Sequence, residues 1–151
     1  MANLDLPDNI LLSLSHVLQQ LQQSLPALKQ ETDFSAIAFK WQDRQLIAIQ
    51  QPRKIDLDDL KGIEKQKEKV IQNTLQFLNG LPANDVLLTG SRGTGKSSIV
   101  SALFTEYANK GLRLIEIERD DLSELPEIQK IIQHRPEKFI VYCDDLAFNA
   151  E

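Results

Sequence analysis

The chain has 151 residues, a hydrophobic content of 42%, a charged content of 26% and a formal net charge of −5 at pH 7. No stretch reaches the ~20 consecutive apolar residues that a membrane-spanning helix requires, and the length suits one globular unit with a small appendage. The acidic balance argues against a surface built mainly to bind nucleic acid, because such affinity depends on lysine and arginine. The N-terminus carries acids where a signal peptide carries bases, so we expect a cytoplasmic protein.

The N-terminal region, 1–52, is expected to contain a helix and a β-hairpin. Leucines recur at alternating spacings of three and four residues over 11–28, which is typical of the apolar face of an amphipathic helix. Two short β-type runs, 36–41 and 45–49, then flank the polar sequence QDR, and this pattern predicts a hairpin. We interpret Trp41 as an anchor at the edge of the core.

The remaining region, 53–151, has the pattern of an α/β fold of the P-loop type. A helix is expected over 63–78, where the sequence NG and Pro82 end it. After Pro82, strands alternate with helices, and this alternation predicts a parallel sheet with helices on both faces. The expected order is strand 86–89, helix 96–108, strand 112–117, helix 125–133 and strand 139–143.

A glycine-rich turn separates the first of these strands from the helix that follows it. Its sequence, GSRGTGKS at 90–97, matches the pattern G-x-x-x-x-G-K-[ST] of phosphate-binding loops. Glycines allow several N–H groups to turn toward one anion, and the next helix presents its positive N-terminus to the same place. We therefore expect the phosphates of ATP or ADP to be bound by Gly90, Ser91, Arg92, Gly93, Thr94, Gly95, Lys96, Ser97 and Ser98.

Four polar side chains have expected roles in the chemistry of this site. Lys96 is placed to reach the β- and γ-phosphates, and the Ser97 hydroxyl is placed to bind Mg²⁺. The apolar strand 139–143 leads directly into Asp144, and the carboxyl ends of parallel strands form the edge where open α/β sheets bind ligands. We expect Asp144 to hold the same Mg²⁺, through water, and Asp145 to orient the attacking water. Capping of the next helix is the alternative role for Asp145.

Four segments of the chain resemble AAA-type P-loop ATPases, and among them a bacterial family of ATP-binding proteins known as a domain of unknown function. They are DLDDLKGIEKQ, NTLQFLNGLPANDVLLTGSRGTGKSS, LRLIEIERDDLSELPEI and RPEKFIVYCDDLAF, within residues 55–148. The resemblance implies that Ile55, Leu60, Gly62 and Ile63 cover the adenine. It also implies Mg²⁺-dependent ATP hydrolysis coupled to a conformational change. In the full-length protein this change would act on a protein or nucleic-acid partner, and a homo-oligomer is compatible with it.

The chain departs from the AAA pattern in two respects. Asp145 stands where many AAA proteins have glutamate, and the shorter side chain would lie farther from the attacking water, which is expected to slow hydrolysis. The sequence also lacks the strand that separates the loop strand from the acidic strand in AAA sheets, together with the sensor, the arginine finger and the helical lid. We therefore expect the chain to be a fragment, with unpaired strand edges where that strand is missing.

Two alternative functions remain open from the sequence. The same loop occurs in phosphotransferases, which pass the γ-phosphoryl group to a small molecule, whereas an ATPase releases phosphate without an added acceptor. The other alternative is an interaction scaffold that binds ATP with negligible turnover. Such a scaffold would dock its partner through the N-terminal helix and hairpin, and would retain it only with nucleotide bound.

Overall fold

The computed structural model describes residues 10, 13–17, 20, 31–91 and 93–144, and the chain divides into two units, Met1–Glu31 and Thr32–Glu151. In the first unit, residues 10, 13–17 and 20 are helical, and all but residue 10 fall within the range over which the leucine spacing predicts a helix. Leu14 is 47% exposed, whereas Leu11, Leu18, Leu21, Leu25 and Leu28 lie outside the described residues. Among the residues that are described, none of the helices has the length and apolarity needed to cross a membrane.

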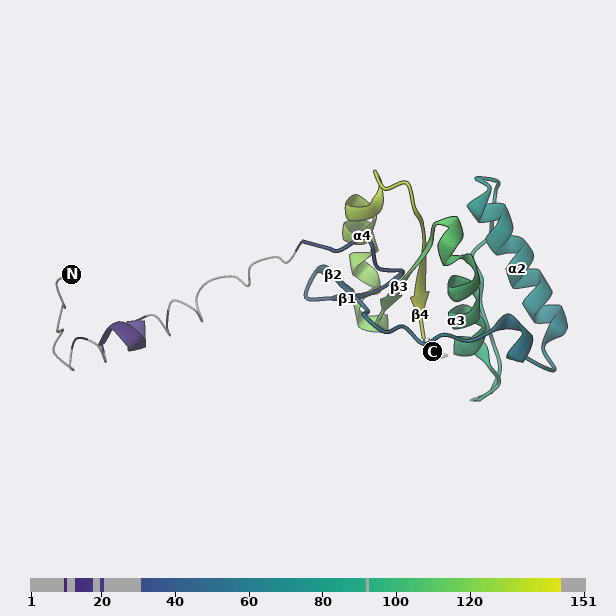
Figure 1. The fold of residues 1–151 in the computed structure, drawn as a ribbon, viewed down its shortest axis with the longest axis horizontal. Coiled ribbons are helices and arrows are strands. Elements are labelled where there is room, and N and C mark those ends of the chain that lie inside the picture. Colours follow the sequence, from purple (N-terminus) through teal and green to yellow (C-terminus); the bar gives the residue numbers. More distant parts are fainter. Residues whose placement is uncertain (1–9, 11–12, 18–19, 21–30, 92, 145–151) are drawn as a thin grey trace, which may run out of the picture. The chain divides into compact units, whose positions relative to one another are not determined.

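The second unit is built on a four-stranded sheet with the order β2-β1-β3-β4 (Figure 1). Its strands are β1 (Ala38–Gln42), β2 (Gln45–Ala48), β3 (Leu112–Ile117) and β4 (Lys138–Cys143). β1 pairs antiparallel with β2, whereas β3 runs parallel both to β1 and to β4. The predicted hairpin and the two predicted strands after the loop helix are confirmed, and the hairpin extends the parallel sheet.

A two-residue turn closes the hairpin. Asp43 and Arg44 have φ angles of +50° and +58°, so both lie in the left-handed region. Consecutive left-handed residues are typical of the hairpin turns whose twist matches that of the flanking strands. The hairpin is also tied to the segment after β3, because Trp41 Nε1 donates a hydrogen bond of 2.6 Å to Glu124 Oε2. Trp41 is only 1% exposed, which confirms its predicted place in the core.

Helices cover both faces of the sheet, as the sequence predicts. Helix α3 (Lys96–Tyr107) packs on one face and α4 (Leu125–Ile132) on the other. Helix α2 (Glu64–Leu78) lies against the outer side of α3 (Figure 1). Short 3-10 turns complete the unit at η1 (Leu57–Asp59), η2 (Ala108–Lys110) and η3 (Arg119–Glu124). The three helices agree with their predicted ranges to within a residue or two at each end.

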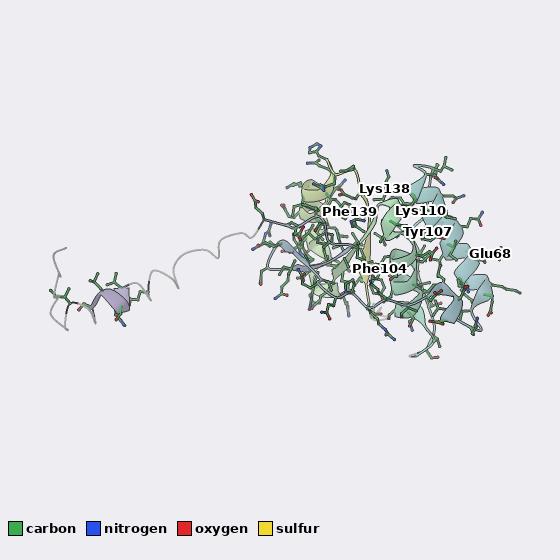
Figure 2. The ribbon with its side chains drawn as sticks, in the orientation of Figure 1. Glu68, Phe104, Tyr107, Lys110, Lys138 and Phe139 are labelled. Atoms are coloured by element: carbon green, nitrogen blue, oxygen red, sulfur yellow. The ribbon has the colours of Figure 1, made fainter. Side chains whose placement is uncertain are left out.

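The strands divide their side chains between two apolar clusters, one on each face of the sheet. Leu112 and Leu114 of β3 pack with Phe104 and Tyr107 of α3, and Figure 2 labels these two aromatic residues. Ile115, which follows Leu114 directly and is fully buried, belongs instead to the cluster that includes Ile128 of α4. This alternation is the two-residue period of a strand that is buried on both faces.

The segment before the glycine loop differs from its prediction. The apolar run predicts a strand over 86–89, but residues 82–90 have no regular secondary structure and lie outside the sheet. Val86 and Leu87 are 48% and 62% exposed. The prediction is wrong here because a strand forms only where a neighbouring strand satisfies its backbone groups, and β1 to β4 pair with one another instead.

One side chain of α2 partly replaces the missing strand partner. Asn73 Nδ2 donates a hydrogen bond of 2.8 Å to the Asn84 carbonyl, and Asn73 Oδ1 accepts one of 2.9 Å from the Asn84 N–H. The amide side chain thus bonds both backbone groups of one residue, as a neighbouring strand would do. Nearer the loop, Leu88 is partly buried against the cluster that contains α3. These contacts position the entrance to the loop.

Candidate functional site

The glycine loop turns sharply before α3 begins at Lys96. Gly90, Gly93 and Gly95 have φ angles of +144°, +81° and +85°, which residues with a Cβ rarely adopt. A Cβ added to Gly90 would lie 3.1 Å from Thr94 Oγ1. That hydroxyl donates a hydrogen bond of 2.8 Å to the Ser91 carbonyl and so fixes the inside of the turn. Backbone conformation therefore favours glycine at all three positions, and limited space is a second requirement at Gly90.

The side chain of Lys96 folds back over the loop. Its Nζ donates hydrogen bonds of 2.9 Å to the carbonyl oxygens of Gly90 and Ser91. Both partners are neutral, so the positive charge of the ammonium group is not cancelled by them. The loop thus presents a cation, in addition to the N–H groups at the start of α3, to any anion that enters it.

The first turn of α3 meets the end of β4 at a pair of side chains. Ser97 Oγ donates a hydrogen bond of 2.7 Å to Asp144 Oδ2, which joins two residues 47 positions apart. Asp144 follows β4 directly, at the carboxyl end of the parallel strands, and both residues of the pair are exposed. The structure therefore brings together the two residues that the sequence predicts as magnesium ligands. Hydroxyl and carboxylate oxygens are the type of ligand that Mg²⁺ prefers.

Tyr142 lies beside the same pair, and no sequence motif singles it out. Burial raises the pKa of Tyr142 to about 12, with smaller influences from the neighbouring Ser97 hydroxyl, which lowers it, and the Asp144 carboxylate, which raises it. The hydroxyl oxygen itself is buried and makes no hydrogen bond within the described ranges. The two-residue spacing of Tyr142 and Asp144 is a signal that was available, because residues at i and i+2 of a strand share a face.

The predicted adenine-binding residues lie before α2, and one of them, Ile63, contacts the loop. Leu60 and Ile63 pack against the cluster that contains α3. Ile63 Cδ1 lies 3.7 Å from the position that a Cβ on Gly95 would occupy. Gly62, between them, has a φ of +77° and makes the turn into α2. The structure thus places this segment next to the loop, while Ile55 lies earlier in the chain, before η1, and is partly buried.

The remaining predicted residues divide into described and undescribed positions. Ser98 lies in the first turn of α3 and is partly buried. Arg92 and Asp145 lie outside the described residues, so their roles stay predictions. The structure therefore describes most of the residues predicted to bind phosphate and metal, and it does not describe Asp145.

A cavity of about 500 Å³ opens beside the Ser97–Asp144 pair. Its lining comes from β1, β3, β4, the first turns of α3 and the segment after β2. Glu118 at its rim bonds Lys40 of β1 at 2.9 Å, and this contact lowers the pKa of Glu118 and raises that of Lys40. The cavity lies at the carboxyl ends of parallel strands, which is where α/β sheets bind ligands.

Comparison with known proteins gives one family and one distant relative. The sequence pattern of the family described as "Protein of unknown function (DUF815)" matches residues 34–151. The replication factor C large subunit of Methanococcus maripaludis is 29% identical to the chain over 84 residues, which are 56% of this chain and 17% of that protein. The chain thus corresponds to a small part of that relative's length. No solved structure matches the chain.

Proposed function

The chain belongs to the family described as protein of unknown function (DUF815), and from that premise we propose that it is an AAA-type module that binds ATP and hydrolyses it with Mg²⁺. The similarity to a replication factor C large subunit supports a nucleotide-binding, ATPase-type module. One observation carries the proposal: the 2.7 Å hydrogen bond from Ser97 Oγ to Asp144 Oδ2. It joins the glycine loop's helix to the acidic strand, the two elements that a magnesium nucleotide requires at one place.

The loop has the features that a polyphosphate requires. Its three left-handed glycines allow the backbone to curve around an anion, and α3 directs its first N–H groups toward the same place. Lys96 supplies a positive charge that the described structure holds on neutral carbonyls. A phosphate group would offer this ammonium a charged acceptor, and hydrogen bonds between charged partners are about twice as strong as neutral ones.

Ser97 and Asp144 fit Mg²⁺, which binds few protein oxygens and takes further oxygens from phosphates and water. When bound, the ion would neutralise charge on the phosphates. Because the Ser97 hydrogen points at Asp144, the lone pairs of Ser97 Oγ are left for a cation. Asp144 would then hold the ion through water. The hydrogen bond therefore prepares both side chains for the same ligand.

The proposal also assigns the residues that contact the adenine, the residue that orients the attacking water, and the partner. Leu60, Gly62 and Ile63, with Ile55, would contact the adenine, and the position of Ile63 beside Gly95 supports this role. Asp145 would orient the water that attacks the γ-phosphate. The nucleotide state would change the conformation seen by a protein or nucleic-acid partner, in a homo-oligomer if subunits complete one another's sites.

Calorimetry with ATP in Mg²⁺ and in EDTA tests binding. Asp144→Asn is expected to remove most of the Mg²⁺-dependent gain in affinity, because it replaces the carboxylate by a neutral amide. Asp120→Asn is the matched control, since Asp120 is exposed on η3 and outside the site. Uptake of ATP by the wild-type chain that does not depend on Mg²⁺, or equal effects of the two substitutions, would contradict the proposal.

Turnover is tested separately from binding. Asp145→Asn is expected to leave ATP affinity unchanged and to lower the rate of phosphate release. Release measured without any added acceptor separates an ATPase from a phosphotransferase. Equal rates of phosphate release in the wild type and in Asp145→Asn would favour the alternative role of Asp145 as a helix cap.

A further inference from the structure

The hydroxyl group of Tyr142 is buried without a hydrogen-bond partner in the described part of the chain. A buried polar atom of this kind destabilises a fold, so each instance calls for an explanation. The ring of Tyr142 packs with Ile140 against the cluster that contains α3. Phenylalanine would provide the same packing without burying an oxygen, so the hydroxyl has no role in the packing itself.

The surroundings of this hydroxyl are the two side chains of the candidate metal site. The Ser97 hydroxyl and the Asp144 carboxylate both lie close enough to it to influence its ionisation. All three residues also line the cavity of about 500 Å³ at the carboxyl ends of the strands. Asp144 accepts the Ser97 hydrogen at Oδ2. A carboxylate has two oxygens with about four acceptor positions, so the same group has the capacity to accept a bond from a phenol as well.

We propose that Tyr142 is a positioning residue for Asp144: when a magnesium nucleotide is bound, its hydroxyl donates a hydrogen bond to the Asp144 carboxylate and holds it beside Ser97. This inference rests on the proposed function. Metal ligands depend on hydrogen bonds from a surrounding layer of groups, which fix the orientation of each ligand. Tyr142 suits this task because its ring is immobilised in the core, whereas Asp144 is exposed.

The geometry also explains why the hydroxyl remains unpaired in the structure. Tyr142 and Asp144 are two residues apart, so their side chains lie on the same side of the chain. The distance from the Tyr142 hydroxyl to the Asp144 carboxylate therefore depends on the rotamer of Asp144 rather than on packing. The Asp144 carboxylate accepts the bond from Ser97 at Oδ2. In the proposed bound state, Asp144 would keep the bond from Ser97 and would offer another of its acceptor positions to the phenol.

Tyr142→Phe in the 151-residue chain tests the inference, with a fluorescent ATP analogue and titrations of Mg²⁺. The substitution is expected to weaken the apparent Mg²⁺ affinity of the nucleotide complex about tenfold, the low end of the range for groups that orient metal ligands. Nucleotide affinity in EDTA is expected to be unchanged, and resistance to urea unchanged or slightly higher, because an unpaired polar atom is removed. Tyr107→Phe is the matched control, since Tyr107 packs in the same cluster but near the other end of α3.

A double-mutant cycle shows whether Tyr142 acts through Asp144. In the Asp144→Asn background, Tyr142→Phe is expected to change Mg²⁺ affinity by less than about twofold, because the group that it positions is already altered. The same tenfold loss in both backgrounds, or an unchanged Mg²⁺ titration in Tyr142→Phe alone, would overturn the inference while leaving the proposed function intact. So would a Tyr142→Phe chain that does not fold. Absence of Mg²⁺-dependent binding in the wild type would overturn both proposals.

Discussion

Two segments lead into the site from different sides, and they are held in different ways. β4 pairs with β3 over its whole length, from Lys138 to Cys143, and delivers Asp144 at its end. The segment 82–90 lies outside the sheet and delivers the glycine loop. Backbone pairing therefore fixes the side of the site where we propose the metal, whereas the side proposed for the phosphates depends on the start of α3 and on local side-chain bonds.

This difference separates stability from ligand recognition. Among the described residues, those that are least exposed lie in the sheet and its two apolar clusters, whereas Val86 and Leu87 are among the most exposed large apolar residues. Substitutions in the sheet should therefore change the free energy of unfolding. Substitutions in and around the loop should change nucleotide affinity or local opening, and leave global stability nearly unchanged.

The largest expected effect is on global stability, for Phe39→Ala in β1. Phe39 is fully buried next to Ile115, and truncation of a buried phenylalanine lowers the free energy of unfolding by about 4 kcal/mol. Leu87→Ala is the control from the other segment, and it is expected to change the free energy by less than about 0.5 kcal/mol. Urea titrations followed by far-UV circular dichroism measure both. Similar losses of unfolding free energy in Phe39→Ala and Leu87→Ala would mean that the sheet and the segment 82–90 contribute equally to global stability.

The next effect is on affinity, for Lys96→Ala. Loss of the ammonium group is expected to weaken binding of ATP by about 2 kcal/mol, or about 30-fold, because a charge-assisted contact with the phosphates is lost. Stability should change little, since Lys96 bonds only two loop carbonyls. Calorimetry of this variant and of Lys69→Ala, an exposed lysine of α2, gives the comparison. If Lys96→Ala bound ATP with wild-type affinity, the loop would not be part of the nucleotide site.

A smaller effect is expected where α2 holds the loop entrance. Asn73→Ala removes both hydrogen bonds to the Asn84 backbone, and exchange of the Asn84 amide hydrogen should accelerate about fivefold, equivalent to about 1 kcal/mol. Amides of β4 should keep their exchange rates. Gln72→Ala, one residue earlier on α2, controls for the change in helix propensity. Acceleration that spreads equally to β4 would mean that the two segments open as one unit.

The smallest effect is expected at the start of β4. Arg135 Nη2 and Nε bond the two Glu137 oxygens at 2.8 and 3.0 Å, and this contact lowers the pKa of Glu137 below its ordinary value of 4.5, against the opposing influence of burial. A lowered folded-state pKa contributes stability above the unfolded value, and this contribution is lost as pH falls through the folded value.

Glu137→Gln measures this contribution. The wild type is expected to be more stable than the variant by up to about 1 kcal/mol at pH 7, and the difference should shrink as pH falls below 4.5. Urea titrations between pH 7 and pH 3 give both curves. Glu68→Gln, an exposed glutamate of α2, is the control. A difference that grows toward low pH would contradict the assignment.

The elements of the second unit were predictable where the local pattern determines them. The period of apolar residues identified α3, β3 and β4, because one or both faces of each element are buried. The pairing of β1 with β3 was not predictable, since the partners are far apart in the sequence and many strands share the same pattern. The strand predicted over 86–89 is wrong for the opposite reason. The segment has the apolar pattern of a strand, but no neighbouring strand pairs with it.

The candidate site was predictable to the extent that its motif fixes backbone positions. The loop pattern located Lys96 and Ser97, and the end of an apolar strand located Asp144, which the structure places 2.7 Å from Ser97. The contribution of Tyr142 depends on a side-chain hydroxyl near both residues, and tyrosine in a strand is usually read as core. Its relation to Asp144 required the three-dimensional arrangement.

The place of β1 in the sheet has a consequence for shortened versions of this protein. β1 covers one edge of β3, through the pairing of Ala38 with Leu114 and of Lys40 with Glu116. A version trimmed to begin at residue 53 would contain the whole glycine loop and yet leave this edge of β3 without its neighbour. Bare edges of apolar strands attract other chains and promote aggregation. Trimming should therefore stop before Thr32, so that the hairpin is retained.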